Sequence, residues 1–269
     1  MKTKHLKQTI TTLLFLLTLN ITAQKIITVP MDNPNEKGLL EIATMNGSIS
    51  IKGYSGNEVI VKGTARIQAN EKEQLVNGLK KVSNTSIEFR VEKYGNEVNV
   101  RNSSKKIIDF EVQVPEKFSL KVTTHNQGEV HVENVNGIMD INNTNGKITL
   151  KDISGSVIAS AMNGDIITNF LKVNPNEPMA FSCMNGDIDV TFPNSIKADM
   201  KINLEGGDIY SNFDWKIISS KKEPEKANPR KKGSQYVIKA KEWLTTSING
   251  GGTEIQIKGY NTDVFVRKQ

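Results

Sequence analysis

The stretch that decides the fold is NGKITLKDISGSVIAS, residues Asn145–Ser160. It contains two glycines, Gly146 and Gly155, and each is followed by apolar residues at the second and fourth positions after it. Alternation of this kind places one face of a short strand inward. The stretch therefore predicts two strands, each of which begins at a glycine corner.

The same pattern continues on both sides of this stretch. Glycines recur at nine-residue intervals, at Gly128, Gly137, Gly146, Gly155 and Gly164. Alternate corners differ, because Val135 and Ile153 stand two positions before Gly137 and Gly155, whereas polar or Met-Asn lead-ins precede the others, so the true period is eighteen residues. The string Met-Asn-Gly also returns three times, at 45–47, 162–164 and 184–186. A string that recurs in this way indicates a unit of architecture and not a catalytic loop.

Two folds use a short strand-and-turn unit, and side-chain parity distinguishes them. In an antiparallel meander with Asn-Gly hairpins, Ile148 would face Asn143 and Met139 would face Asn134. Stacking by eighteen residues instead matches like with like, in the columns Val130, Ile148, Ile166 and Met139, Val157. The sequence therefore favours an all-β, single-chain β-solenoid with coils of about 18 residues and two strands each.

The corners and one irregular segment complete this prediction. Gly and Asn tolerate the positive φ that a sharp corner needs, and we expect stacked Asn side chains to bond to one another along the axis. Between 71 and 82, Leu75, Leu79 and Val82 follow helical spacing, but Asn77-Gly78 interrupts it. We expect a short helix or an irregular excursion from the coil there.

The N-terminus has the features of a secretory signal peptide. A basic start is followed by an apolar run from Ile10 to Ile21 and then by ITAQ. The apolar run is shorter than the ~20 residues that span a bilayer, and nothing after it resembles a membrane span. We predict a signal peptide at 1–23, a single β-solenoid putative-adhesin domain at 24–269, and no transmembrane segment in the mature chain. The one cysteine, Cys183, cannot form an internal disulfide, and we interpret it as a small buried apolar residue.

The basic balance of the chain is concentrated in one segment. The formal net charge is +6, yet the stretch KKEPEKANPRKK at 221–232 alone contains six basic and two acidic residues. We interpret 219–235 as a solvated polar loop insert. Nucleic-acid binding is not expected, because no basic segment is interleaved with aromatic residues.

These motifs resemble a known family. The glycine repeat, VPEKFSLKV at 114–122, INGGG at 248–252 and DVFVRK at 263–268 are similar to the bacterial β-strand-repeat putative-adhesin family. This is a domain of unknown function akin to the head-GIN auto-transporter-adhesin-like proteins. The resemblance covers about 42–268 and implies an exported β-solenoid at the cell envelope. It supplies no catalytic residues.

The repeat contains acidic residues and histidines whose spacing can be compared with that of metal and catalytic sites. In calcium-binding nonapeptide repeats an Asp stands two residues after the last Gly, whereas here that position is apolar, as at Ile148. The acidic residues Asp165, Asp187 and Asp189 fall on outward positions of successive coils and form a candidate acid–base patch. His125 and His131 match no metal-ligand spacing.

An aromatic group lies near the insert, namely Tyr210, Phe213, Trp215 and Trp243. These side chains fit either a glycan site or a cap that closes one end of the solenoid, and the cap is the favoured reading. No catalytic residue, cofactor or metal is expected, and the binding residues are left unassigned.

The leading functional hypothesis is an exported, non-enzymatic adhesin or envelope scaffold that binds a surface glycan or protein. The alternatives are a periplasmic sensing or regulatory partner protein and, more weakly, a polysaccharide-active β-helix enzyme. The expected location is the periplasm, the cell surface or the medium. Open solenoid ends also allow end-to-end self-association.

Overall fold

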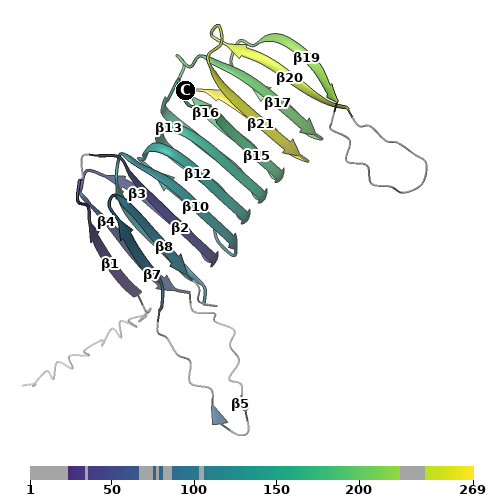
Figure 1. The fold of residues 1–269 in the computed structure, drawn as a ribbon. Helices are drawn as coiled ribbons and strands as arrows, with labels where there is room; N and C mark the ends of the chain where they lie inside the picture. Colours follow the sequence, from purple (N-terminus) through teal and green to yellow (C-terminus); the bar gives the residue numbers. More distant parts are fainter. Residues whose placement is uncertain are drawn as a thin grey trace, which may run out of the picture.

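The protein is an elongated stack of β-strands, which we call the rack. The computed structural model describes residues 24–33, 36–66, 75–76, 79–80, 87–102, 106–224 and 240–269. All regular structure in these ranges is β-strand, which confirms the predicted all-β class. The strands form an elongated stack of two layers, with β1 and β7 at one end and β19 and β20 at the other (Figure 1). None of the described residues forms a helix that could cross a membrane.

The front layer is the set of strands nearest the viewer in Figure 1. In stacking order it consists of β7 (Arg90–Tyr94), β8 (Glu97–Asn102), β2 (Gly38–Asn46), β10 (Phe118–Asn126), β12 (Asn136–Asn145), the second half of β13 (Ile148–Asn163), β15 (Met179–Asn185), β21 (Thr253–Tyr260), β17 (Ala198–Glu205), β20 (Ala240–Ile248) and β19 (Lys216–Pro224).

The rear layer lies behind the front layer and shares β13 with it. In stacking order it consists of β1 (Gln24–Pro30), β4 (Glu58–Ala65), β9 (Ile108–Pro115), β3 (Ile49–Tyr54), β11 (Val130–Glu133), the first half of β13, β14 (Ile166–Val173), β16 (Ile188–Phe192), β22 (Val264–Lys268) and β18 (Ile209–Ser211).

The register of the middle strands follows the sequence repeat. Val130 lies opposite Ile148, and Ile148 lies opposite Ile166, in parallel pairs. Met139 lies opposite Val157 in the front layer, also in a parallel pair. Parallel stacking of like on like excludes the antiparallel meander for these strands and gives a solenoid-like arrangement.

The predicted coil length applies only to part of the rack. The next residue in the Ile166 column is Ile188, and Ile188 is followed by Val264. These steps are longer than eighteen residues, because the chain inserts a loop before β15 and two further strand pairs before β21. The eighteen-residue spacing therefore describes the middle of the stack and not the whole chain.

The stacking order departs from the chain order at both ends. Near the C-terminal end, β21 lies between β15 and β17, and β22 lies between β16 and β18. Near the N-terminal end, β2 lies between β8 and β10, and β3 lies between β9 and β11. Antiparallel strands then extend the layers outward, with β7 beside β8, β4 beside β9 and β20 beside β17.

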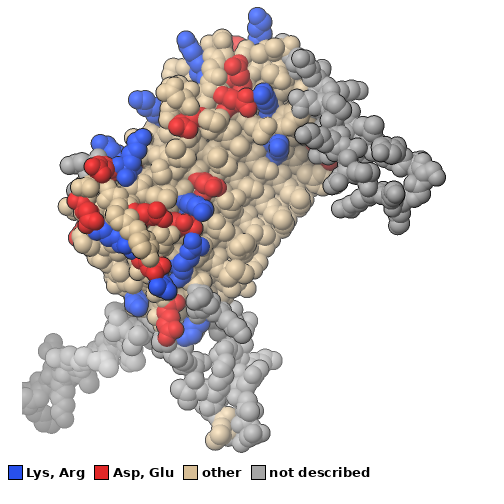
Figure 2. Space-filling model, in the orientation of Figure 1, with Lys and Arg blue, Asp and Glu red and all other residues tan. Residues whose placement is uncertain are grey.

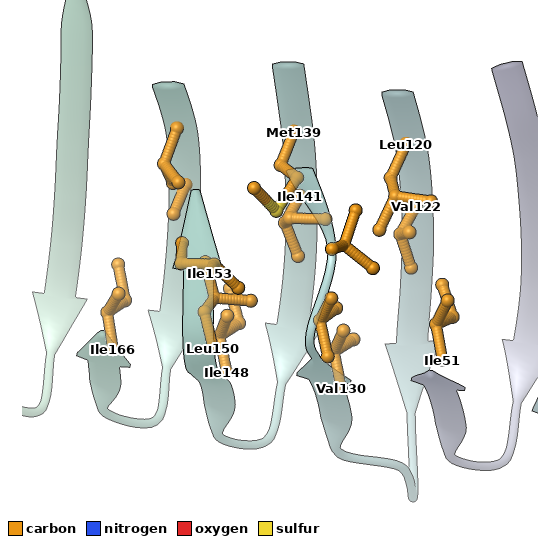
Figure 3. Packing of buried hydrophobic residues seen from close by; sticks show 14 of the residues in the cluster. Ile51, Leu120, Val122, Val130, Met139, Ile141, Ile148, Leu150, Ile153 and Ile166 are labelled. Carbon is orange, nitrogen blue, oxygen red and sulfur yellow. The ribbon is translucent and has the colours of Figure 1, made fainter. Parts of the chain in front are cut away.

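One hydrophobic core runs the length of the rack between the layers. Ile148, Met139 and Ile166 are fully buried, and Figure 3 shows their side chains pointing into the space between the strands. Each coil supplies only a few apolar side chains, so they are covered by the coils on either side. Burial of one such side chain is worth about 1.5–3 kcal/mol.

Glycine is required where one corner packs on the next. At Gly164 φ is +147°, and an added Cβ would lie 2.3 Å from the carbonyl oxygen of Gly146. Gly146 has the same φ and stands in the same way on Gly128. A larger residue would meet backbone atoms and not a side chain that could move aside, so the glycine spacing fixes the distance between coils.

The corner asparagines form the ladder that the sequence predicted. The ladder begins at Asn126, whose Oδ1 accepts a hydrogen bond from Asn145 Nδ2. In the same way Asn145 accepts from Asn163, and Asn163 accepts from Asn185. The donor–acceptor distances are 3.0, 2.8 and 2.9 Å. The second residue of Met-Asn-Gly therefore links coils along the axis.

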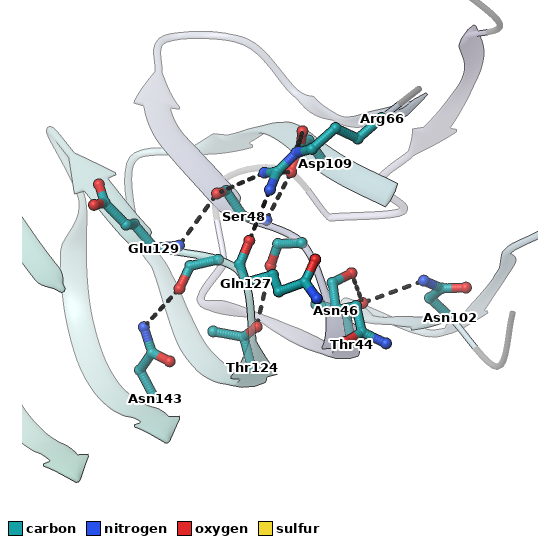
Figure 4. A network of polar contacts seen from close by, with 12 residues as sticks. Thr44, Asn46, Ser48, Arg66, Asn102, Asp109, Thr124, Gln127, Glu129 and Asn143 are labelled. Carbon is teal, nitrogen blue, oxygen red and sulfur yellow. Dashed lines mark hydrogen bonds and ion pairs between the residues drawn. The ribbon is translucent and has the colours of Figure 1, made fainter. Parts of the chain in front are cut away.

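A charged cluster holds the same corner near the N-terminal end (Figure 4). The guanidinium of Arg66 donates to the carboxylate of Asp109 and, at 2.9 Å, to the carbonyl oxygen of Gln127. Asp109 also accepts the backbone N–H of Ser48 at 2.8 Å, and the Ser48 hydroxyl accepts that of Glu129 at 3.1 Å. One arginine thus connects strands that are far apart in the sequence.

Several predicted features fall partly or wholly outside the described residues. The expected signal peptide at 1–23 lies outside them. Of the expected excursion at 71–82, only β5 (Leu75–Val76) and β6 (Leu79–Lys80) are described, and they pair antiparallel and are not helical. Strand β19 includes 219–224, the first part of the expected polar insert, and 225–239 are not described.

Cys183 is buried in the core, as predicted. Its side chain is 4% exposed, and its Sγ atom lies 3.4 Å from the carbonyl oxygens of Gly164 and Gly186. Burial raises the pKa of the Cys183 thiol above its ordinary value, and the nearby carboxylates of Asp165 and Asp187 raise it further. The thiol is therefore held in its protonated, unreactive form.

The inward column can be tested at its centre. Replacement of Ile148 by Asp would bury a carboxylate without a partner, and we expect a loss of about 3 kcal/mol or more in the free energy of unfolding. The matched control is Thr149→Asp, because Thr149 is the next residue and points outward; there we expect a change within about 0.5 kcal/mol. Urea unfolding measures both, and equal effects of the two substitutions would contradict the assignment of faces.

The state of Cys183 gives a second test. Because only the thiolate reacts, we expect a thiol reagent at pH 8 to modify the native protein far more slowly than the urea-unfolded chain. As the pH rises, the modification rate of the unfolded chain should level off once its thiol is ionised. The modification rate of the native protein should begin to rise only at a higher pH, because its thiol has a raised pKa. Similar rates and pH profiles in the two states would show that the thiol is neither buried nor shifted.

Candidate binding face

The outer surface of the front layer has an uncharged middle. Figure 2 shows charged side chains towards the two ends of this surface and uncharged residues between them. On the two central strands, β13 and β15, the outward residues from Ile158 and Ala180 onwards carry no charge; they are Ile158, Ser160, Met162, Ala180, Ser182 and Met184. This strip lies in the middle of the stack.

On β13, β15 and β21, four large side chains of this surface remain about half exposed. The exposed fractions are 48% for Ile158, 46% for Met162, 47% for Met184 and 55% for Tyr260. Single exposed apolar residues are ordinary in soluble proteins, but neighbouring ones mark interaction surfaces. Parallel pairing of β13 with β15 and of β15 with β21 brings Met162, Met184 and Tyr260 into one row.

A groove of about 420 Å³ runs beside this row. One wall, which we call the apolar wall, consists of Met162, Met184 and Tyr260. The other, which we call the polar wall, consists of Ser160, Ser182, Lys258 and Asn203, which are paired in register across β13, β15, β21 and β17. We call this feature the axial groove, because it crosses the strands and follows the axis of the stack.

The floor of the axial groove depends on small residues. Ala161, Cys183 and Gly259 lie between the two walls, and all three are buried. Their side chains point into the core or, for Gly259, are absent, so nothing rises between the walls. Glu205 lies opposite Tyr260 on β17 and borders the groove at one end.

The Met residues of Met-Asn-Gly are the part of this site that the sequence analysis missed. The repeat was interpreted as architecture, which is correct for Asn163 and Gly164. Met162, however, is out of phase with the inward positions Ala159 and Ala161, so parity alone places it on the outer surface. An apolar residue at an outward position was the available signal.

The candidate acid–base patch proves to be a structural ladder. Asp165 Oδ1 accepts the backbone N–H of Asp187 at 3.2 Å, and Asp187 Oδ1 accepts that of Asp263 at 3.3 Å. Asp189 lies apart from this ladder, and its carboxylate is bound by Arg267 Nε at 2.8 Å. Among the described residues, no cluster of His, Cys, Asp and Glu has the arrangement of a metal site.

The two histidines of the repeat lie on opposite surfaces. His125 is on the outer surface of the front layer, where Nδ1 is 3.1 Å from the Thr144 hydroxyl. His131 is on the outer surface of the rear layer, with Nε2 4.0 Å from Glu133. They share no site, as their spacing indicated.

The aromatic group near the insert does not form one cluster. Phe213 is buried, and Trp215 packs against the core, so these two close the C-terminal end of the rack as a cap. Tyr210 stacks instead on Phe265 on the rear surface, with ring centroids 5.0 Å apart. Trp243 lies beneath the Lys258 ammonium group, 5.6 Å from it.

The chain is similar to solved structures at low sequence identity. No curated protein matches the chain. Among solved structures, a Clostridium sporogenes protein described as a "putative cell adhesion protein" is 14% identical, with a TM-score of 0.46 over 92% of this chain and 100% of that chain. A Bacteroides fragilis protein described as a "putative adhesin" is 10% identical, with a TM-score of 0.38 over 92% and 97% of the two chains.

A sequence-family model matches residues 3–242, which is most of the chain. This match agrees with the resemblance predicted from the repeat, to a domain family of unknown function. The chain belongs to the Toastrack DUF4097 family.

Proposed function

We propose that this chain is an exported, non-enzymatic binding protein that attaches to a component of the cell envelope through the outer surface of its front layer. The observation that carries the proposal is the uncharged strip on β13 and β15, bordered by the axial groove. A rigid, flat face of this kind presents the same chemistry over several strands, which suits a large or repetitive partner.

The arrangement of acidic residues weighs against an enzyme. Asp165 and Asp187 accept backbone N–H groups, and Asp189 is bound by Arg267. Carboxylates with such fixed partners do not form an acid–base pair with separated roles. A sensing or regulatory protein that docks another protein on the same strip is the second candidate, supported by the half-exposed Ile158, Met162 and Met184.

The remaining parts of the proposal concern the whole chain. Residues 1–23 act as a signal peptide, 24–269 form one domain, and 219–235 are a polar insert, of which 219–224 belong to β19. The ends of the rack present strand edges, at β1 and β18 for example, through which copies of the chain could associate end to end.

Binding to the envelope can be tested with one pair of variants. Purified protein is mixed with envelope fragments from cells that lack the gene, and co-sedimentation is measured. We expect Met184→Lys to reduce binding about tenfold or more, because a charge on the strip must be desolvated against the partner.

The matched control is Ile167→Lys, since Ile167 is an exposed apolar residue on the rear surface. It should bind like the wild type. Retention of binding by both variants would exclude the front strip as the binding surface, and loss in both would indicate a general effect of charge.

Export is tested separately by the mass of the protein recovered from cells. We expect the mature chain to begin at Gln24, because Ala23 ends the small-residue segment after the apolar run. A chain recovered from the cytoplasm that retains residues 1–23 would contradict export. Protease treatment of intact cells then distinguishes a protein on the surface from one in the periplasm.

A further inference from the structure

The two walls of the axial groove have opposite chemical character. The apolar wall offers two thioethers and one aromatic ring, from Met162, Met184 and Tyr260. On β13 and β15 the polar wall offers the hydroxyls of Ser160 and Ser182. A ligand that fits both walls has an apolar face on one side and hydrogen-bonding groups along the other.

The groove also repeats itself. Its wall residues come from four adjacent strands, β13, β15, β21 and β17, which are paired in register. Neighbouring strands are about 4.8 Å apart, so the contacts recur at that interval along the axis. A polymer that lies in the groove with repeating units of about the width of one strand spacing meets a Met and a Ser on both β13 and β15, and then Tyr260 and Lys258 on β21.

The charges around the groove disfavour an ionic polymer. Over β13 and β15 the walls are uncharged, and the two charged side chains beyond them, Lys258 and Glu205, have opposite signs. Lys258 is also engaged by the Trp243 ring at 5.6 Å. An anionic polymer would find no continuous row of cations in this groove, and a cationic one no continuous row of carboxylates.

A sugar ring has the features that these walls require. Its axial C–H bonds form an apolar face that packs on aromatic rings, and its hydroxyls project from the edge. Tyr260 is 55% exposed and provides such a ring surface. The volume of about 420 Å³ is in the range of small-molecule pockets, and its lining residues come from four adjacent strands, so a bound chain would lie across the strands.

We propose that the axial groove binds a neutral polysaccharide chain that runs along the axis of the rack. The sugar faces pack on Tyr260 and Met184, and the hydroxyls bond to Ser160 and Ser182. This inference rests on the proposed function, since it names the class of partner that the front surface holds.

Affinity electrophoresis provides the test. The purified protein is run in native gels that contain a soluble neutral polymer, with a β-1,4-glucan, an α-1,4-glucan and a mannan as the three probes. We expect at least one of them to retard the wild type, and the retardation to persist in high salt because no ion pair is involved. A gel with alginate, an anionic polymer, is run in parallel.

Three variants assign the effect to the groove. Tyr260→Ala should weaken the affinity about tenfold or more, whereas Tyr260→Phe should keep it, because the ring and not the phenol makes the contact. Tyr210→Ala is the matched control, since Tyr210 is a half-exposed aromatic residue on the rear surface. It should be retarded like the wild type.

Each other outcome overturns the proposal. It is wrong if none of the neutral polymers retards the wild type, if only alginate does, or if Tyr260→Ala binds as well as the wild type. Should envelope binding still depend on Met184 in that case, the partner on the front surface is a protein, and the proposed function stands. Should envelope binding be unaffected by Met184→Lys as well, the proposed function fails with it.

Discussion

The close packing of glycine corners is the constraint on which the rest of this structure depends. Gly128, Gly146 and Gly164 approach one another so closely that no Cβ fits between a corner and the carbonyl oxygen of the next. With this spacing set, the strands that leave each corner can form parallel ladders in register. The register then places apolar side chains of one coil directly over those of its neighbours, and the core follows from that.

The same register determines the outer surface. Because side chains alternate along a strand, a column of like residues inside implies a second set of columns outside. The core requires the inner columns to be apolar, whereas no such requirement applies to the outer ones. The apolar row of Met162, Met184 and Tyr260 is therefore not explained by folding, and this is why it is the most informative part of the surface.

The sequence predicted the middle of the rack better than its ends. Local spacing in the sequence is enough to predict the columns through Ile148 and Met139, the corner glycines and the asparagine ladder. The place of β21 and β22 could not be predicted in this way, because a strand such as Ile255–Ile257 would stack equally well on any coil with the same pattern. The groove was missed for a related reason, since its floor combines Ala161, Cys183 and Gly259 from coils that become neighbours only in the folded chain.

The position of β21 and β22 has a consequence for the time course of folding. These strands are synthesised after β15, β16, β17 and β18, yet they lie between them. Until they arrive, β15 and β16 on one side and β17 and β18 on the other have unpaired edges, and such edges accept strands from other chains. This part of the rack can be completed only after β21 and β22 have left the ribosome. Until then the chain has an open gap between β15 and β17 and between β16 and β18, into which β21 and β22 of another copy would fit.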